Sequence, residues 1–252
     1  MVIYCSDKKL LMKQPAGIGD IFFCQKIARY FKHYGYTVYW PVLPSLTWIQ
    51  DYIPVIEFPS LDDDFPGKGI IYEEGMGFHI GELQPNTSGP HNAFVNTANA
   101  DLTHNDGKIM SSKYSMLGMD HSDWQKYFLF RRFEEKENEL FYNILGLNDD
   151  SEYVFINNLY NTDVRDSKFL SAEQFDLPVV PLRIIDGFTI FDWCTVMERA
   201  KKIHTVNTAI NYIIDGLETL FYDEYVIYAH DENNKSEIDY LFKKPHTMLC
   251  RS

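Results

Sequence analysis

The spacing of apolar residues predicts a strand, a helix and a second strand within the first forty residues. An apolar run at 9–13 leads into a glycine loop, and from Ile21 to Tyr34 the apolar residues recur at helical spacing. These positions are Phe23, Ile27, Tyr30, Phe31 and Tyr34. Asp20 stands where an N-cap is expected and Gly35 where a C-terminal glycine is expected. The β-branched and aromatic stretch 36–40 is then predicted to be a strand.

The second half of the chain repeats this alternation of strands and helices. The predicted strands are 153–157, 177–185, 203–206 and 224–229, and the predicted helices are 191–201 and 208–217. A strand that is followed by a helix and another strand implies parallel pairing, because the helix carries the chain back over the sheet. Both halves are therefore predicted to contain a parallel sheet.

Between these segments the pattern is less regular. It predicts a short helix at 45–52, strands at 55–58 and 70–73, a stretch of little periodicity at 75–107, and mostly helix over 111–147. The expected fold class is α/β, with two Rossmann-like halves whose parallel sheets face a cleft. We place the halves at 1–130 and 131–252.

Charge and composition narrow the classes of partner. The chain has 252 residues, 23 of them basic and 36 acidic, which gives a formal net charge of −13. An acidic excess argues against nucleic acid, which needs a basic face, and against an anionic membrane surface. No apolar run approaches the ~20 residues that span a bilayer. No signal peptide is visible, and the four cysteines are far apart and at no metal-ligand spacing. We therefore expect a cytoplasmic protein.

The sharpest local feature is the loop Gly17-Ile18-Gly19-Asp20. Glycines let a ligand approach the backbone closely, and the start of a helix offers N–H groups to an anion. Position 22 is Phe, so the full dinucleotide fingerprint is absent, and an NAD enzyme or a nucleotide-sugar epimerase is only weakly supported. Asp20 is either a helix N-cap or a carboxylate that takes a proton from a hydroxyl at the ligand-binding edge of the sheet.

A second junction between strand and helix lies at Asn207 and Thr208. These residues are either an ordinary N-cap or, with the first N–H groups of the helix, a grip on a phosphate. Two such junctions, one in each half, favour a ligand cleft more than either one alone.

Two further features have simpler interpretations. The acidic triplet 62–64 matches a D-x-D pattern that holds a divalent cation in one class of sugar transferase, but its flanking prolines favour a solvated turn. His79 lies in a glycine-rich segment and is a second candidate base, whereas the other histidines of the irregular middle are at no metal-ligand spacing. No nucleophile elbow supports hydrolase chemistry.

Several segments resemble heptosyltransferase-like glycosyltransferases of the GT-B fold. In the first half they are Gly17-Ile18-Gly19-Asp20-Ile21, Gly35-Tyr36-Thr37-Val38-Tyr39-Trp40 and Tyr52-Ile53-Pro54-Val55-Ile56-Glu57. In the second half they are Phe191-Asp192-Trp193-Cys194, Glu198-Arg199-Ala200 and Ile203-His204-Thr205-Val206-Asn207-Thr208-Ala209. Where the family's donor domain usually has Asp-Ser, this chain has Asn207-Thr208.

The resemblance implies an inverting, metal-independent transfer of a sugar from a nucleotide-diphosphate sugar to a hydroxyl of a glycan or glycoconjugate. The nucleotide sugar is a co-substrate, and neither a cofactor nor Mg²⁺ is expected to be required. The N-terminal half would bind the acceptor and the C-terminal half the donor. Asp20 maps onto the family's general base, and Asn207 and Thr208 map onto its diphosphate site. The other proposed substrate-binding residues are Gly17, Gly19, Lys113, Asn157, Arg165, Arg183 and Asp186.

The alternative is a non-catalytic nucleotide- or glycan-binding protein that uses the same fold, because fold does not determine function. Consumption of the donor distinguishes the two, since a binding protein would hold the nucleotide without releasing the sugar.

Overall fold

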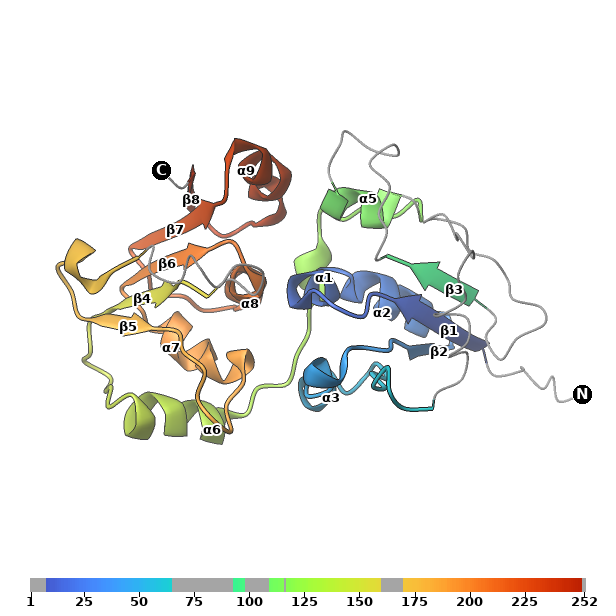
Figure 1. Cartoon of the computed structure of the whole chain (residues 1–252), viewed down its shortest axis with the longest axis horizontal. Coiled ribbons are helices and arrows are strands. Elements are labelled where there is room, and N and C mark those ends of the chain that lie inside the picture. Colours follow the sequence, from blue (N-terminus) through green and yellow to red (C-terminus); the bar gives the residue numbers. More distant parts are fainter. Residues whose placement is uncertain (1–7, 65–92, 98–108, 116, 160–169, 251–252) are drawn as a thin grey trace, which may run out of the picture. The chain divides into compact units, whose positions relative to one another are not determined.

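The computed structural model describes residues 8–64, 93–97, 109–115, 117–159 and 170–250 (Figure 1). The chain divides into two compact units, Met1–Arg131 and Arg132–Ser252. Each unit has its own parallel sheet and its own buried core. The expected α/β class with parallel sheets is confirmed.

The sheet of the first unit has β1 (Lys8–Lys13) at its centre, between β2 (Tyr36–Tyr39) and β3 (Ala93–Asn96). Both neighbours run parallel to β1. The residues 10–12 of β1 are completely buried, which is usual for a central strand covered on both faces. The strand, glycine loop, helix and strand predicted for this segment are confirmed.

The predicted helix 21–34 is two helices, α1 (Ile18–Phe23) and α2 (Gln25–His33), with Cys24 between them. The position of Asp20 in the sequence suggested a helix N-cap, but Asp20 is not the N-cap of α1. Gly17 is the N-cap, and Asp20 lies inside the first turn of α1.

The buried face of α2 also differs from the apolar stripe read from the sequence. Ile27 and Phe31 are buried as expected, but Tyr30 and Tyr34 are exposed, and the small side chain of Ala28 is buried in their place. Gly35 has the expected positive φ of 82° at the end of α2.

The rest of the first unit contains short elements. They are η1 (Pro44–Leu46), α3 (Ile49–Tyr52), α5 (Ile109–Ser115) and η3 (Trp124–Tyr127). The predicted strand 55–58 is wrong: Glu57 forms only an isolated bridge with Tyr39, because the prolines on either side of the segment cannot donate to a ladder. The helical prediction 111–147 is wrong over 117–133 apart from the short η3, and Gly118 turns the chain there at a φ of 64°. The predicted strand 70–73 lies outside the described residues.

The sheet of the second unit has the order β5-β4-β6-β7-β8, with all pairs parallel. Its strands are β4 (Val154–Asn157), β5 (Val179–Pro181), β6 (Lys202–Val206), β7 (Glu224–Ala229) and β8 (Thr247–Cys250). Its helical elements are α6 (Glu134–Asn138), η4 (Glu139–Ile144), η6 (Ala172–Gln174), η7 (Ile190–Trp193), α7 (Cys194–Glu198), α8 (Ala209–Gly216), α9 (Glu232–Ile238) and η8 (Asp239–Leu241). Prolines shorten the strand predicted at 177–185 to β5, and α9 and β8 were not predicted.

Each sheet contains a topological switch point, where successive strands are added first on one side of a strand and then on its other side. In the first unit β2 pairs with one side of β1 and β3 with the other, and in the second unit β5 and β6 flank β4 in the same way. Open α/β sheets bind ligands outside the carboxyl ends of the strands at such a switch point. The edges after β1 and β3, and after β4 and β6, are therefore the places to search for a site.

Candidate functional site

Two buried polar residues mark the switch point of the first sheet. Gln14 directly follows β1 and Thr97 directly follows β3. The Thr97 backbone N–H donates to the Lys13 carbonyl at 3.1 Å, which extends the pairing of the two strands. The Trp40 indole N–H donates to the Gln14 carbonyl at 3.0 Å. The ends of β1 and β3 are thus fixed by hydrogen bonds at the switch point, where a ligand is expected.

Lys113, on α5, brings a buried ammonium group to these residues. Its Nζ donates to Gln14 Oε1 at 3.0 Å and to the Thr97 carbonyl oxygen at 2.7 Å. It also forms an ion pair with Asp20 Oδ1 at 3.0 Å, and its side chain is 3% exposed. An ammonium has three N–H donors, so these three oxygens account for its hydrogen-bonding capacity. Lys113 is one of the proposed substrate-binding residues, and the structure places it beside the candidate base.

Asp20 is held between Lys113 and Gly17. A Cβ atom on Gly17 would lie 2.3 Å from Asp20 Oδ2, and Gly17 has a φ of +79°, so the position requires glycine for two reasons. Gly19 is the second residue of α1 and directly precedes Asp20. The Asp20 side chain is 29% exposed. A carboxylate that is fixed at the edge of the sheet and still reachable from solvent can accept a proton from a bound hydroxyl.

Cys24 lies behind this cluster, at the junction of α1 and α2. Burial raises the pKa of its thiol to about 12, and the nearby Lys113 ammonium only partly offsets that effect. The thiolate is the reactive form of cysteine, so Cys24 is a packing residue rather than a nucleophile.

We expect Cys24 to resist alkylation in the folded protein, because the raised pKa and the burial both suppress the thiolate. The measurement is iodoacetamide labelling at about pH 8, a pH at which an ordinary exposed thiol reacts, followed by mass spectrometry of the peptide that contains Cys24. The same peptide should label readily in guanidinium. Equal labelling rates in the folded and unfolded chain would show that the α1–α2 junction is open.

In the second sheet, Asn157 and Thr208 meet at the switch point. Asn157 ends β4 and is fully buried, and Thr208 lies between β6 and α8. Asn157 Nδ2 donates to Thr208 Oγ1 at 2.8 Å, and Asn157 Oδ1 accepts from the Leu159 backbone N–H at 2.9 Å. Thr208 is the N-cap residue of α8, but its side chain forms no hydrogen bond to the helix. The first N–H groups of α8 are therefore not capped by this hydroxyl, the arrangement that favours an anionic ligand.

Asn207 and Asn211 fix the chain on either side of Thr208. The Asn207 backbone N–H donates to the Tyr228 carbonyl at 3.0 Å, and Asn207 Nδ2 donates to Asn234 Oδ1 at 3.4 Å. In the core, Thr205 Oγ1 donates to Asn211 Oδ1 at 2.5 Å. The start of α8 is thus attached to β6, β7 and α9.

The other candidate residues from the sequence analysis are not placed in the Lys113 cluster or at the Asn157–Thr208 contact. Arg183 and Asp186 lie exposed in the loop that follows the edge strand β5. His79 and Arg165 lie outside the described residues. Within each unit, the structure brings together Gly17, Asp20 and Lys113, and Asn157 with Thr208.

The acidic triplet 62–64 forms a turn in which Asp63 Oδ2 accepts the Ser60 backbone N–H at 3.1 Å. In the parts of the chain that the structure describes, no three His, Cys, Asp or Glu side chains are grouped so that they could hold a metal ion. Likewise, none of the described helices combines the length and the apolar character needed to cross a membrane.

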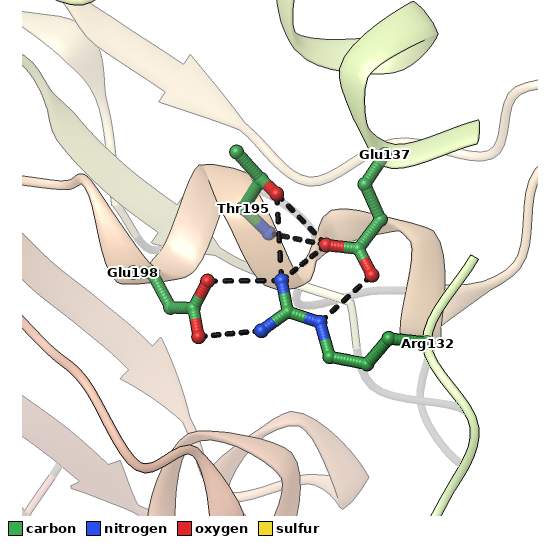
Figure 2. Close-up of polar contacts among 4 residues, drawn as sticks. All are labelled: Arg132, Glu137, Thr195 and Glu198. Atoms are coloured by element: carbon green, nitrogen blue, oxygen red, sulfur yellow. Dashed lines mark hydrogen bonds and ion pairs between the residues drawn. The ribbon is translucent and has the colours of Figure 1, made fainter. Parts of the chain in front are cut away.

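Sequence reasoning missed two groups of residues. Gln14 could have been found as the first polar residue after the predicted strand 9–13, whereas Thr97 could not, because the strand before it was not predicted. The second group is a cluster in the second unit that joins Arg132, Glu137, Thr195 and Glu198 (Figure 2). Nothing in the sequence signals it, because its members come from segments far apart in the chain.

In this cluster, the Arg132 guanidinium donates to Glu198 Oε1 at 2.6 Å, to Glu198 Oε2 at 2.9 Å and to Glu137 Oε1 at 2.8 Å. Glu137 is almost completely buried, and its Oε2 accepts from the Thr195 N–H at 3.1 Å and the Thr195 hydroxyl at 2.8 Å. These bonds connect the start of the second unit to α6 and α7. The cluster therefore stabilises the packing of α6 and α7 in the second unit.

Comparison with known proteins gives a likeness of fold. No family model matches the chain, and no curated protein is similar to it. A glycosyl transferase family 9 structure from Veillonella parvula DSM 2008 aligns with a TM-score of 0.57 and 12% identity over 97% of this chain and 88% of that one. The dodecameric iron-containing heptosyltransferase TibC in complex with ADP-D-beta-D-heptose aligns with a TM-score of 0.50 and 11% identity over 97% of this chain.

The chain covers 63% of the TibC chain in this complex. A second similar structure is TibC from enterotoxigenic E. coli H10407. At these identities the likeness concerns the fold alone, an α/β architecture with parallel sheets that this chain shares with glycosyltransferases. The resemblance drawn from the short sequence motifs agrees with these neighbours at that level.

Proposed function

We propose that this chain is a glycosyltransferase of the GT-B type. It moves a sugar from a nucleotide-diphosphate sugar to a hydroxyl of a glycan or glycoconjugate, with inversion and without a required metal. The first unit binds the acceptor, and the second unit binds the nucleotide sugar. The likeness of fold to family 9 glycosyltransferases supports the class of reaction, and the TibC complex supports a nucleotide sugar as the donor.

The first unit supplies the base. Asp20 takes the proton of the acceptor hydroxyl while the hydroxyl oxygen attacks the anomeric carbon, and the bond from that carbon to the diphosphate breaks. Attack from the face opposite the leaving group inverts the configuration. The fixed, partly exposed carboxylate at the switch point of the first sheet is the observation that carries the proposal.

The second unit stabilises the leaving group. The uncapped N–H groups at the start of α8 and the Thr208 hydroxyl face the position where negative charge grows on the departing diphosphate. Asn157 orients the Thr208 hydroxyl by donating to it, so the hydroxyl is free to donate its own proton to a phosphate oxygen.

The proposal is tested by thermal unfolding with UDP, GDP, ADP and dTDP and with their common sugars, each with and without Mg²⁺. A ligand at ~100 times its dissociation constant adds about 2.7 kcal/mol of stability, which is an easily measured shift. We expect a shift that is selective for one nucleotide and independent of Mg²⁺. No shift with any of these compounds would remove the support for a nucleotide-sugar enzyme.

We expect Thr208→Val to weaken binding of the nucleotide that gives this shift. The variant removes one hydrogen bond to the diphosphate, so its dissociation constant should rise by about 3- to 10-fold, as for one lost neutral hydrogen bond. Isothermal titration calorimetry measures the change. Thr247→Val, on the exposed side of β8 in the same unit, is the matched control and should bind as the unmodified chain does. Equal affinities for the two variants would place the diphosphate elsewhere.

A further inference from the structure

The Lys113 ammonium is committed to the protein's own oxygens. Its Nζ donates to Gln14 Oε1 and the Thr97 carbonyl oxygen and forms an ion pair with Asp20 Oδ1, all at 2.7–3.0 Å. The side chain is buried, so a move toward a solvent-exposed phosphate would leave the Thr97 carbonyl without this donor, and Gln14 Oε1 would keep only a 3.4 Å bond from the Thr97 hydroxyl. Such a move is unfavourable, because a buried polar group that loses its partner is not compensated by water.

The partners of Lys113 lie at the structural centre of the first unit. Gln14 follows the central strand β1, Thr97 follows its neighbour β3, and Asp20 lies in the first turn of α1. One ammonium on α5 thus connects both sides of the switch point to the helix that carries the candidate base.

Gln14 extends this connection into the glycine loop. Its side chain accepts from Lys113 through Oε1 and donates through Nε2 to the Ala16 carbonyl at 2.7 Å. Ala16 precedes Gly17, whose Cα lies against Asp20 Oδ2. One oxygen of the Asp20 carboxylate is therefore held by Lys113 directly, and the other rests on a loop that Lys113 fixes through Gln14.

Taking the proposed function as its premise, we propose that Lys113 is a positioning residue for Asp20 and does not bind the donor diphosphate. It orients the carboxylate at the edge of the sheet so that one oxygen faces the acceptor hydroxyl. Productive proton transfer depends on such placement, because a shift of about 1 Å in a reacting group can lower a rate by a factor of ~10².

The test compares Lys113→Met and Asp20→Asn, each alone and together, with Lys126→Met as the control. Lys126 is an exposed lysine of the same unit, so its replacement makes the same change in net charge. Two quantities are measured with the nucleotide sugar that stabilises the chain: its dissociation constant by calorimetry, and the rate of nucleoside diphosphate release with a glycan acceptor.

We expect Lys113→Met to lower kcat by at least about 10-fold while the dissociation constant of the donor changes less than about 2-fold. The double variant should be no slower than Asp20→Asn by more than about 2-fold, because Lys113 acts through Asp20. A lysine that only supports the fold would instead lower kcat by a similar factor in both backgrounds.

If Lys113→Met fails to fold by circular dichroism, Lys113→Arg replaces it. A guanidinium would still bind a diphosphate but cannot reproduce the three contacts of the ammonium, so we expect slower turnover at unchanged donor affinity. A donor dissociation constant raised about 10-fold in Lys113→Met, or normal turnover in the variant that folds, would overturn the assignment. Absence of donor binding and turnover in the unmodified chain would instead overturn the proposed function and this inference together.

Discussion

Asp20→Asn is expected to lower turnover by a factor of ~10² or more while the fold and the donor affinity are preserved. The amide has nearly the shape of the carboxylate but cannot accept the acceptor's proton. The substitution removes the counter-charge of the buried Lys113 ammonium, although the amide oxygen can still accept a hydrogen bond from it, so we expect the fold to be retained with a loss of about 1–2 kcal/mol in stability. The measurement is the rate of nucleoside diphosphate release at saturating donor, together with the unfolding midpoint and the donor dissociation constant.

Asp51→Asn is the matched control for this variant. Asp51 is an exposed aspartate on α3 in the same unit, and the substitution makes the same chemical change. It should leave turnover, donor affinity and stability unchanged. Near-normal turnover in Asp20→Asn would assign Asp20 a purely structural role at the start of α1.

Arg132→Met is expected to give the largest loss of stability, about 3 kcal/mol in the free energy of unfolding. The substitution leaves the carboxylate of Glu137 buried, with only the two Thr195 donors to compensate it, and it also removes the two bonds to Glu198. The estimate lies at the lower end of the range for buried ion pairs, because the Arg132 side chain is 31% exposed.

Urea denaturation measures this loss, with Arg183→Met as the control. Arg183 lies exposed in the loop after β5, and its substitution should change the free energy of unfolding by less than about 0.5 kcal/mol. Equal stabilities for the two variants would mean that Glu137 is reached by solvent in the folded protein.

The sequence was sufficient to predict the elements that are defined by local patterns. The strands β1, β2, β4, β6 and β7 are short apolar or β-branched runs bounded by polar residues or glycine, and the structure confirms them. Gly17 and Asp20 were identified because a glycine loop before a helix is a local signal. Asn157 and Thr208 were identified because each ends a predicted strand or begins a predicted helix.

What the sequence could not predict depends on contacts between distant segments. The bond from Lys113 to Gln14 joins residues 99 positions apart, and no spacing rule connects them. The break at Cys24 between α1 and α2 interrupts a continuous helical pattern, so periodicity alone extended one helix across it. Strand β8 is only four residues long, which is too short a pattern to recognise without its partner β7.

Consumption of a nucleotide sugar distinguishes a glycosyltransferase from a protein that only binds the nucleotide. The most direct measurement is the release of nucleoside diphosphate, detected by mass spectrometry, from the nucleotide sugar that stabilises the unmodified chain. It is made in EDTA with a panel of simple glycosides as acceptors, and Asp20→Asn is assayed in parallel. We predict release that depends on the acceptor, persists in EDTA and falls by ~10² in the variant. Binding of the nucleotide sugar without any release would contradict the account and identify a nucleotide-binding protein that shares the fold.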